Sequence, residues 1–169
     1  MHRNVIAMMF TLLTLGVFVL VFLASKYGLA QHAWEADTTY FTAAILAVFA
    51  VGFMGVTRAL LDCSYYFDRP EKASLTDLER TLEPLEWLAY VLSNLQWLAL
   101  IWGLIGGISA ASKMEVQGPE GAVRMAQEVF QHFSVALWPA IVSVVCYLVL
   151  QSYVVLLRYG HNRIKGRMG

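Results

Sequence analysis

The chain has 169 residues, of which 59% are hydrophobic and only 14% are charged. Soluble globular domains are about half apolar and about a quarter charged, so this composition excludes an ordinary soluble domain. The formal net charge is zero and the basic residues form short flanks rather than a stripe, which excludes a nucleic-acid partner.

Four apolar segments are long enough to cross a bilayer, whose hydrocarbon core of about 30 Å requires about 20 helical residues. The first segment, 5–24, has no charge and is longer than a signal-peptide core, so we expect a retained span. The others are 41–60, 87–111 and 133–157. Each must be helical, because backbone groups in lipid need partners within their own segment. The sequence therefore predicts an all-α integral membrane protein with four transmembrane helices in a single domain, 1–169.

Lysine and arginine are distributed unequally between the two sets of segments that flank these spans. Nine lie in one set, namely Arg3, Arg58, Arg69, Lys72, Arg80, Arg158, Arg163, Lys165 and Arg167. Three lie in the other set, namely Lys26, Lys113 and Arg124. Because cytoplasmic flanks are enriched in basic residues, the larger set predicts that both the N and the C terminus are cytoplasmic. We expect a multi-pass protein of a cell membrane, surrounded by membrane lipid.

The connections between the spans are predicted as two outer loops, 25–40 and 112–132, and one cytoplasmic loop, 61–86. In the second outer loop, the Gly-Pro-Glu-Gly stretch 118–121 predicts a break. A short amphipathic helix is predicted after this break, over 122–133.

The third and fourth helices are predicted to extend into the cytoplasm. Ser74 and Asp77 have the spacing of a capping box, which predicts a helix that begins near Leu75 and continues into the third span. The fourth span is expected to continue as a helix through Arg158 toward Arg163.

Ionisable residues are absent from the central part of every predicted span. A charge at mid-membrane costs about 2.5–3.5 kcal/mol on insertion scales, so such residues usually mark function, and their absence argues against a carrier with its own carboxylate. The four histidines lie at or beyond the span ends, which leaves a haem without paired ligands. Cys63 and Cys146 are far apart and form no CxxC pattern. We expect no catalytic residue, no metal or cofactor and no enzyme activity.

Small and uncharged polar residues are concentrated in the third and fourth spans. They are Ser93, Asn94, Gln96, Gly103, Gly106, Gly107 and Ser109, followed by Ser134, Pro139, Ser143, Gln151 and Ser152. Small residues let helices approach closely, and polar residues hydrogen-bond across helices. Two interpretations stay open: packing within one bundle, or a pore or cavity that receives part of a partner. The first two spans are more uniformly apolar, which is typical of lipid-facing helices.

Two stretches in this half of the chain carry motifs. Gly103–Ala110 reads Gly-Leu-Ile-Gly-Gly-Ile-Ser-Ala, and Ala136–Val144 reads Ala-Leu-Trp-Pro-Ala-Ile-Val-Ser-Val. They resemble the Gly-Leu-Leu-Gly-Thr-Val-x-Gly and Ala-Leu-x-x-Thr-x-x-Gly-Leu motifs of the MotA/TolQ/ExbB family of ion-driven motor channels. The approach Leu85–Ala89 and the exit Tyr159–Asn162 are also similar, so the resemblance extends over 82–162.

The resemblance implies a channel or stator subunit that forms a pentamer in the bacterial inner membrane. Single-span partner helices of the MotB/TolR/ExbD type would stand in its central pore, and the partner would carry the membrane aspartate that binds a proton or sodium ion. Ion flow would then rotate the ring. The residues that the resemblance places at the pore or against the partner are Gly103, Gly106, Gly107, Ser109, Pro139, Ala140 and Ser143.

Other functions stay open. The threonines of the family motifs correspond to Gly107 and Ala140, so both hydroxyls are missing, which favours a non-conducting membrane scaffold or assembly subunit. Ser109 and Ser143, within about one helical turn of these positions, either supply hydroxyls or act as small packing residues. A small membrane carrier or enzyme is a weaker alternative, because it needs a buried polar cluster that the sequence does not indicate.

Overall fold

The computed structural model describes residues 2–28, 31, 41–68, 75–114 and 118–168. Its four long helices are α1 (His2–Lys26), α3 (Phe41–Asp68), α4 (Leu75–Ala111) and α5 (Gly118–Met168). All four are long and apolar enough to cross a membrane. The predicted helical class and the predicted number of membrane-length helices are therefore confirmed.

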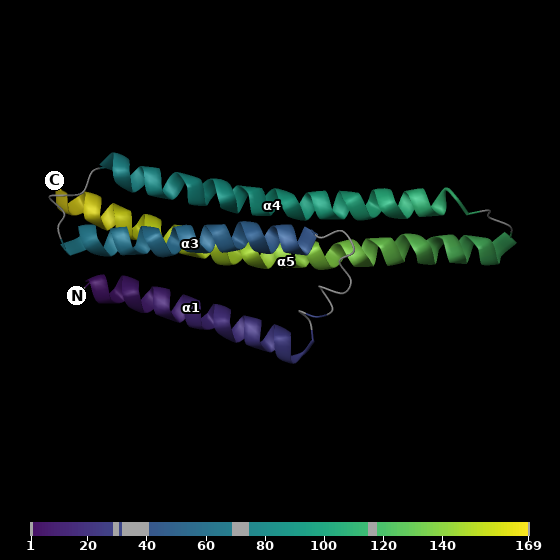
Figure 1. Ribbon diagram of the computed structural model, residues 1–169, viewed down its shortest axis with the longest axis horizontal. Coiled ribbons are helices and arrows are strands. Elements are labelled where there is room, and N and C mark those ends of the chain that lie inside the picture. The colour runs from purple at the N-terminus through teal and green to yellow at the C-terminus, as the bar shows by residue number, and fades with distance from the viewer. Residues whose placement is uncertain (1, 29–30, 32–40, 69–74, 115–117, 169) are drawn as a thin grey trace.

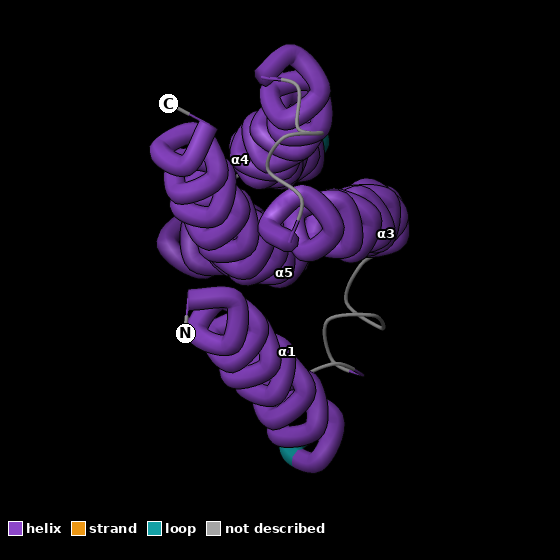
Figure 2. Tube along the Cα trace, turned by 90° about the vertical axis from the view of Figure 1, so that its left-hand side faces the viewer, coloured by secondary structure: helices purple, strands orange, loops and turns teal. Residues whose placement is uncertain are grey.

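The four helices run alternately up and down along one long axis (Figure 1). α1 begins and α5 ends at the same end of this bundle, which we call the terminal end. α4 connects to α5 at the opposite end, which we call the hairpin end. Viewed along the bundle, α3, α4 and α5 cluster together and α1 diverges from them (Figure 2).

The helix bounds agree with the sequence in some places and differ in others. α4 begins at Leu75, as the capping-box spacing predicts, and remains helical through Pro84. α3 continues past the expected end of the second span to Asp68, so much of the predicted loop 61–86 is helical. Most of the predicted loop 25–40, together with Arg69, Lys72 and Ser74, lies outside the described residues.

The predicted helix over 122–133 is not a separate element but the first part of α5. Gly118 has a φ of 74°, a left-handed conformation that favours glycine, and it precedes Pro119 at the start of the helix. Proline is tolerated in a first helical turn, because its missing N–H would lack a helical partner there anyway. The sequence pattern that predicts a break therefore marks the start of one uninterrupted helix.

The core lies where α3, α4 and α5 meet, and α5 is its central element. Val56, Leu92, Leu150, Tyr153 and Leu157 are all buried there. Burying such side chains contributes about 1.5–3 kcal/mol each in water. Between helices already in lipid this transfer term is largely lost, so packing and hydrogen bonds hold the helices together.

α1 is the peripheral helix. Its contact with the core depends on Tyr153, whose hydroxyl lies 2.9 Å from the Thr14 hydroxyl and whose ring packs 5.2 Å from the Phe10 ring. Met8, Leu12 and other large side chains along α1 are exposed. This exposure fits the lipid-facing character that is expected for the first span.

α3 differs from that expectation, because it packs into the core. A Cβ on Gly52 would lie 2.9 Å from a Leu150 methyl group, and a Cβ on Gly55 would lie 2.8 Å from a Leu85 methyl group. The two glycines thus let leucines of α5 and α4 approach the α3 backbone. The predicted contrast between two outer spans and two inner spans holds for α1 and fails for α3.

The α4–α5 hairpin extends beyond α1 and α3 at the hairpin end (Figure 1). Because α3 and α4 are antiparallel and Gly55 faces Leu85, the first residue of α3 lies level with about Ala99 of α4. From that level α4 continues for about 12 residues, or about 18 Å, to Ala111. Among the described residues, this part of the molecule consists of α4 and α5 alone.

Candidate functional site

The two motif stretches meet along the interface between α4 and α5. A Cβ added to Gly103 would overlap the Ala136 Cβ and would lie 3.3 Å from the carbonyl oxygen of His132. The first residue of one motif is therefore packed against the first residue of the other. Only glycine permits such a close approach, since any side chain would collide with the facing helix.

The contact continues toward the hairpin end. A Cβ on Gly107 would lie 3.3 Å from the carbonyl oxygen of Val129, and a Cβ on Gly106 would lie 3.5 Å from the His132 Nδ1. Gly107 is buried and Gly106 is half-buried. The glycines of the first motif thus form a flat surface on which α5 lies.

The second motif supplies the facing surface nearer the middle of the helices. Pro139, Ala140 and Ser143 are buried. The Ser143 hydroxyl donates a hydrogen bond of 2.5 Å to the backbone carbonyl oxygen of Leu92 in α4. Pro139 has no N–H to donate, so one carbonyl of the preceding turn loses its usual helical partner.

The structure brings five of the seven predicted site residues into one buried interface, namely Gly103, Gly107, Pro139, Ala140 and Ser143. Gly106 lies at its edge, and Ser109 is exposed, with its carbonyl accepting a hydrogen bond from Ser112. These contacts lie within one chain and support the packing interpretation. A role for these residues at a pore or against a partner stays a prediction.

The face of α4 opposite this interface carries a regular stripe that sequence reasoning missed. Its members are exposed and recur at alternating spacings of three and four: Trp87, Tyr90, Asn94, Trp97, Ile101, Leu104 and Ile108. Trp97 is 59% exposed. The Asn94 side chain donates a hydrogen bond of 2.8 Å to the Tyr90 carbonyl of its own helix. Leu98, Trp102 and Ile105 beside the stripe are exposed as well, so the exposed face is broad and apolar. Its helical periodicity was present in the sequence.

Charged residues gather at the terminal end, beyond the apolar part of the helices. Arg158 of α5 forms an ion pair with Glu86 of α4, and Lys165 forms another with Glu79, with 2.8 Å between Nζ and Oε1. The hydrogen bond from Lys165 lowers the pKa of the Glu79 carboxyl. These pairs join α4 to α5 at a level where water competes, so each contributes little to stability.

His161, one turn beyond Arg158 on α5, is a buried titratable group at this end. It is 3% exposed, and its Nδ1 has no hydrogen-bond partner among the described residues. Burial lowers the pKa of this imidazole, and the nearby Lys165 ammonium lowers it further. The histidine is therefore neutral at physiological pH.

No group of three or more His, Cys, Asp or Glu side chains in the part of the chain that the structure describes could hold a metal ion. Cys63 and Cys146 are separate buried thiols, which fits packing residues.

No protein-family model, curated protein or solved structure matches the chain.

Proposed function

We propose that the chain is the ring-forming subunit of a small ion-driven membrane motor, with single-span partner helices inside the ring. The observation that carries this proposal is that α4 is packed on one face and exposed on the other. One face holds the glycine motif against the second motif in α5, and the opposite face carries the exposed stripe, which includes the polar Asn94. The stripe would pack on a helix of the next copy.

The stripe favours protein over lipid as its neighbour because it contains Asn94, whose amide lipid cannot satisfy beyond the bond to Tyr90. Polar side chains between membrane helices contribute about 0.6 kcal/mol on average and help to fix how the helices pair.

We place the terminal end in the cytoplasm of a bacterial cell, because its arginines and lysines outnumber those of the hairpin end. α4 and α5 then extend past their predicted spans into the cytoplasm, and the α4–α5 hairpin projects outward. The charge distribution supports a partner as the carrier of the ion-binding carboxylate, since none occurs in the central part of a span of this chain.

The test is the mass of the complex after purification in mild detergent. We expect a pentamer that retains a single-span companion. Replacing Trp97 and Ile101 of the stripe by alanine should shift the mass toward the single chain. The matched control is a double alanine variant at Leu15 and Phe18, which are exposed on α1 outside the stripe. A single-chain mass for the unmodified protein contradicts the proposal.

A non-conducting scaffold is the second candidate, and the lack of hydroxyl groups at the two motif positions favours it. Gly107 and Ala140, which correspond to the family threonines, have no hydroxyl, and that of Ser143 is bonded to the Leu92 carbonyl. Proton and sodium flux into liposomes that contain the purified complex distinguishes the two. Flux that is lost when the partner's membrane aspartate is changed to asparagine supports the motor, and no flux supports the scaffold.

A further inference from the structure

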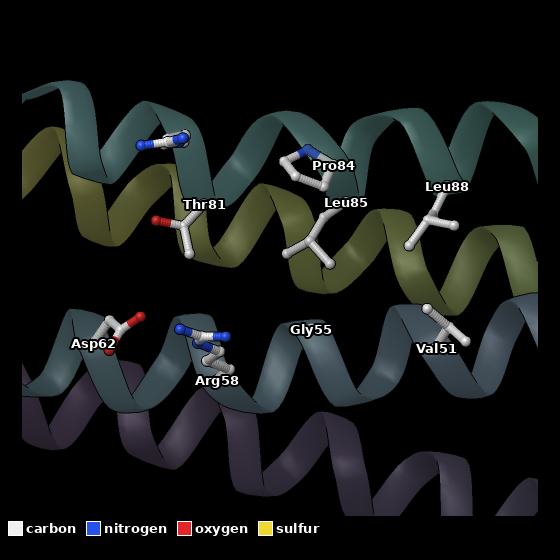
Figure 3. A pocket seen from close by; sticks show the side chains of 9 residues that line it. Val51, Gly55, Arg58, Asp62, Thr81, Pro84, Leu85 and Leu88 are labelled. Carbon is white, nitrogen blue, oxygen red and sulfur yellow. The ribbon is translucent and has the colours of Figure 1, made fainter.

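A cleft of about 540 Å³ opens between α3 and α4 near the terminal end. Arg58 and Asp62 point from α3 toward α4, and Thr81 and Leu85 point from α4 toward α3 (Figure 3). The helices are antiparallel, so one end of the cleft faces the charged terminal end and the other faces the apolar middle of the bundle.

The end of the cleft toward the terminal end is polar and basic. Arg58 and Arg80 line it from opposite helices, together with Thr81 and Asp62. Among the described residues, neither guanidinium forms an ion pair; the pairs at this end use Arg158 and Lys165 instead. Two guanidinium groups on facing helices, without an ion pair among the described residues, suit a phosphate, which accepts two parallel hydrogen bonds from arginine.

The other end of the cleft is apolar. Val51 lies about two turns before Arg58 on α3, and Leu88 lies about two turns after Arg80 on α4, so both line the cleft on the side of the apolar core. Gly55 and Leu85 line the cleft between them, and the Leu85 side chain lies against the Gly55 backbone. A soluble phosphate compound would leave this part of the cleft empty.

We propose that this cleft binds one anionic phospholipid, with its phosphate between Arg58 and Arg80 and an acyl chain along Val51, Gly55 and Leu88. Basic pockets between membrane helices on the cytoplasmic side are suited to anionic lipid headgroups. Thr81 and Asp62 lie at the rim, where a hydroxyl-bearing headgroup such as that of phosphatidylglycerol donates hydrogen bonds to the carboxylate. The site does not depend on the proposed motor function, since it is formed within one chain.

The experiment is native mass spectrometry of the full chain in detergent, titrated with phosphatidylglycerol and, separately, with phosphatidylcholine. We expect tighter binding of phosphatidylglycerol. The double variant R58Q/R80Q should weaken its binding about thirtyfold, which corresponds to about 1 kcal/mol for each arginine near the membrane surface. R163Q is the matched control, because Arg163 lies at the same end but bonds Tyr159 outside the cleft.

A second pair of variants tests the apolar end of the cleft while both arginines remain. V51W should fill this end and weaken phosphatidylglycerol binding at least tenfold, whereas M54W, on an exposed face of the same helix, should bind normally. Inorganic phosphate should not displace the lipid. Equal binding of both lipids, unchanged binding in R58Q/R80Q, equal losses in V51W and M54W, or displacement by inorganic phosphate would each overturn the proposal.

Discussion

At the terminal end α3, α4 and α5 enclose a core around Tyr153 and Leu157, with α1 packed on Tyr153. At the hairpin end, among the described residues, α4 and α5 continue alone (Figure 1). In the first region large side chains interlock and ion pairs link the helices beyond the core. In the second region glycines bring two helix backbones together, and the large side chains point outward.

The two regions have a similar apolar composition but differ in whether their large side chains are buried within the chain or exposed. The core side chains of the terminal region are covered by the chain's own helices. The stripe of α4 runs along both regions, from Trp87 beside the core to Ile108 in the hairpin, and its side chains are exposed. In a bilayer such a surface meets lipid or another protein helix, and Asn94 within the stripe favours the helix.

The largest effect is expected at Gly103, where the hairpin region depends on backbone contact. G103L should destabilise the protein by about 3 kcal/mol, because the new side chain collides with Ala136 and α5 has to move away. The measurement is thermal unfolding in detergent, followed by tryptophan fluorescence. G16L is the matched control, since a Cβ at Gly16 meets no atom within 4 Å. Equal stability of both variants would show that the close approach is unimportant.

Ser143 should have the next largest effect, since it joins α4 to α5 between the two regions. S143A removes the buried hydrogen bond to the Leu92 carbonyl and should cost about 1 kcal/mol of unfolding free energy. S152A serves as the control, because the Ser152 hydroxyl bonds the Leu148 carbonyl of its own helix. A loss in S152A as large as that in S143A would contradict the interhelical role.

The ion pairs of the terminal region should contribute less. E86Q breaks the pair with Arg158 and should lower the unfolding free energy by about 0.5 kcal/mol at low salt, because both side chains are about half exposed. The loss should shrink at high salt. E83Q, a neighbouring exposed glutamate without an ion pair among the described residues, should have no measurable effect. A loss of several kcal/mol in E86Q would mean that the pair is shielded from water.

The smallest effect is a dependence on pH that is confined to the terminal region. Because burial lowers the pKa of His161, the unfolded chain binds its proton more readily, so the stability that the neutral imidazole contributes is lost as pH falls below the usual histidine value of 6.5. The charged groups around it are Glu79, Glu83 and Glu86 of α4, with Arg158 and Lys165 of α5.

Unfolding temperatures at about pH 7.5 and about pH 5.5 test this dependence. The unmodified chain should be less stable at the lower pH, and H161N should lose most of that difference. H132N is the control, since His132 is exposed and lies in the hairpin region. If H161N kept the full dependence on pH, another group would have to be responsible.

The sequence predicts where the helices lie along the chain better than it predicts which helices pack against one another. Apolar run length places the spans, and the spacing of Ser74 and Asp77 places the start of α4, because both signals are local. The position of α3 in the core was missed, because an apolar helix has a similar sequence whether it faces lipid or protein. Gly52 and Gly55 were the available signal.

The residues of the candidate site were predicted from the sequence, but the contacts between them were not. The motif residues were identified from their order along the chain, whereas their meeting across α4 and α5 depends on the register between two helices, which no local pattern specifies. Arg58 and Arg80 entered the sequence argument only as charges that set orientation. Their approach across the cleft became visible only in three dimensions.

We propose that the exposed stripe of α4 is covered by other copies of this chain. Counting the copies in complexes ejected from native membrane nanodiscs in a mass spectrometer tests it most directly. We expect a pentamer, which is reduced toward the single chain when Trp97 and Ile101 are replaced by alanine. A single copy surrounded only by lipid would contradict it.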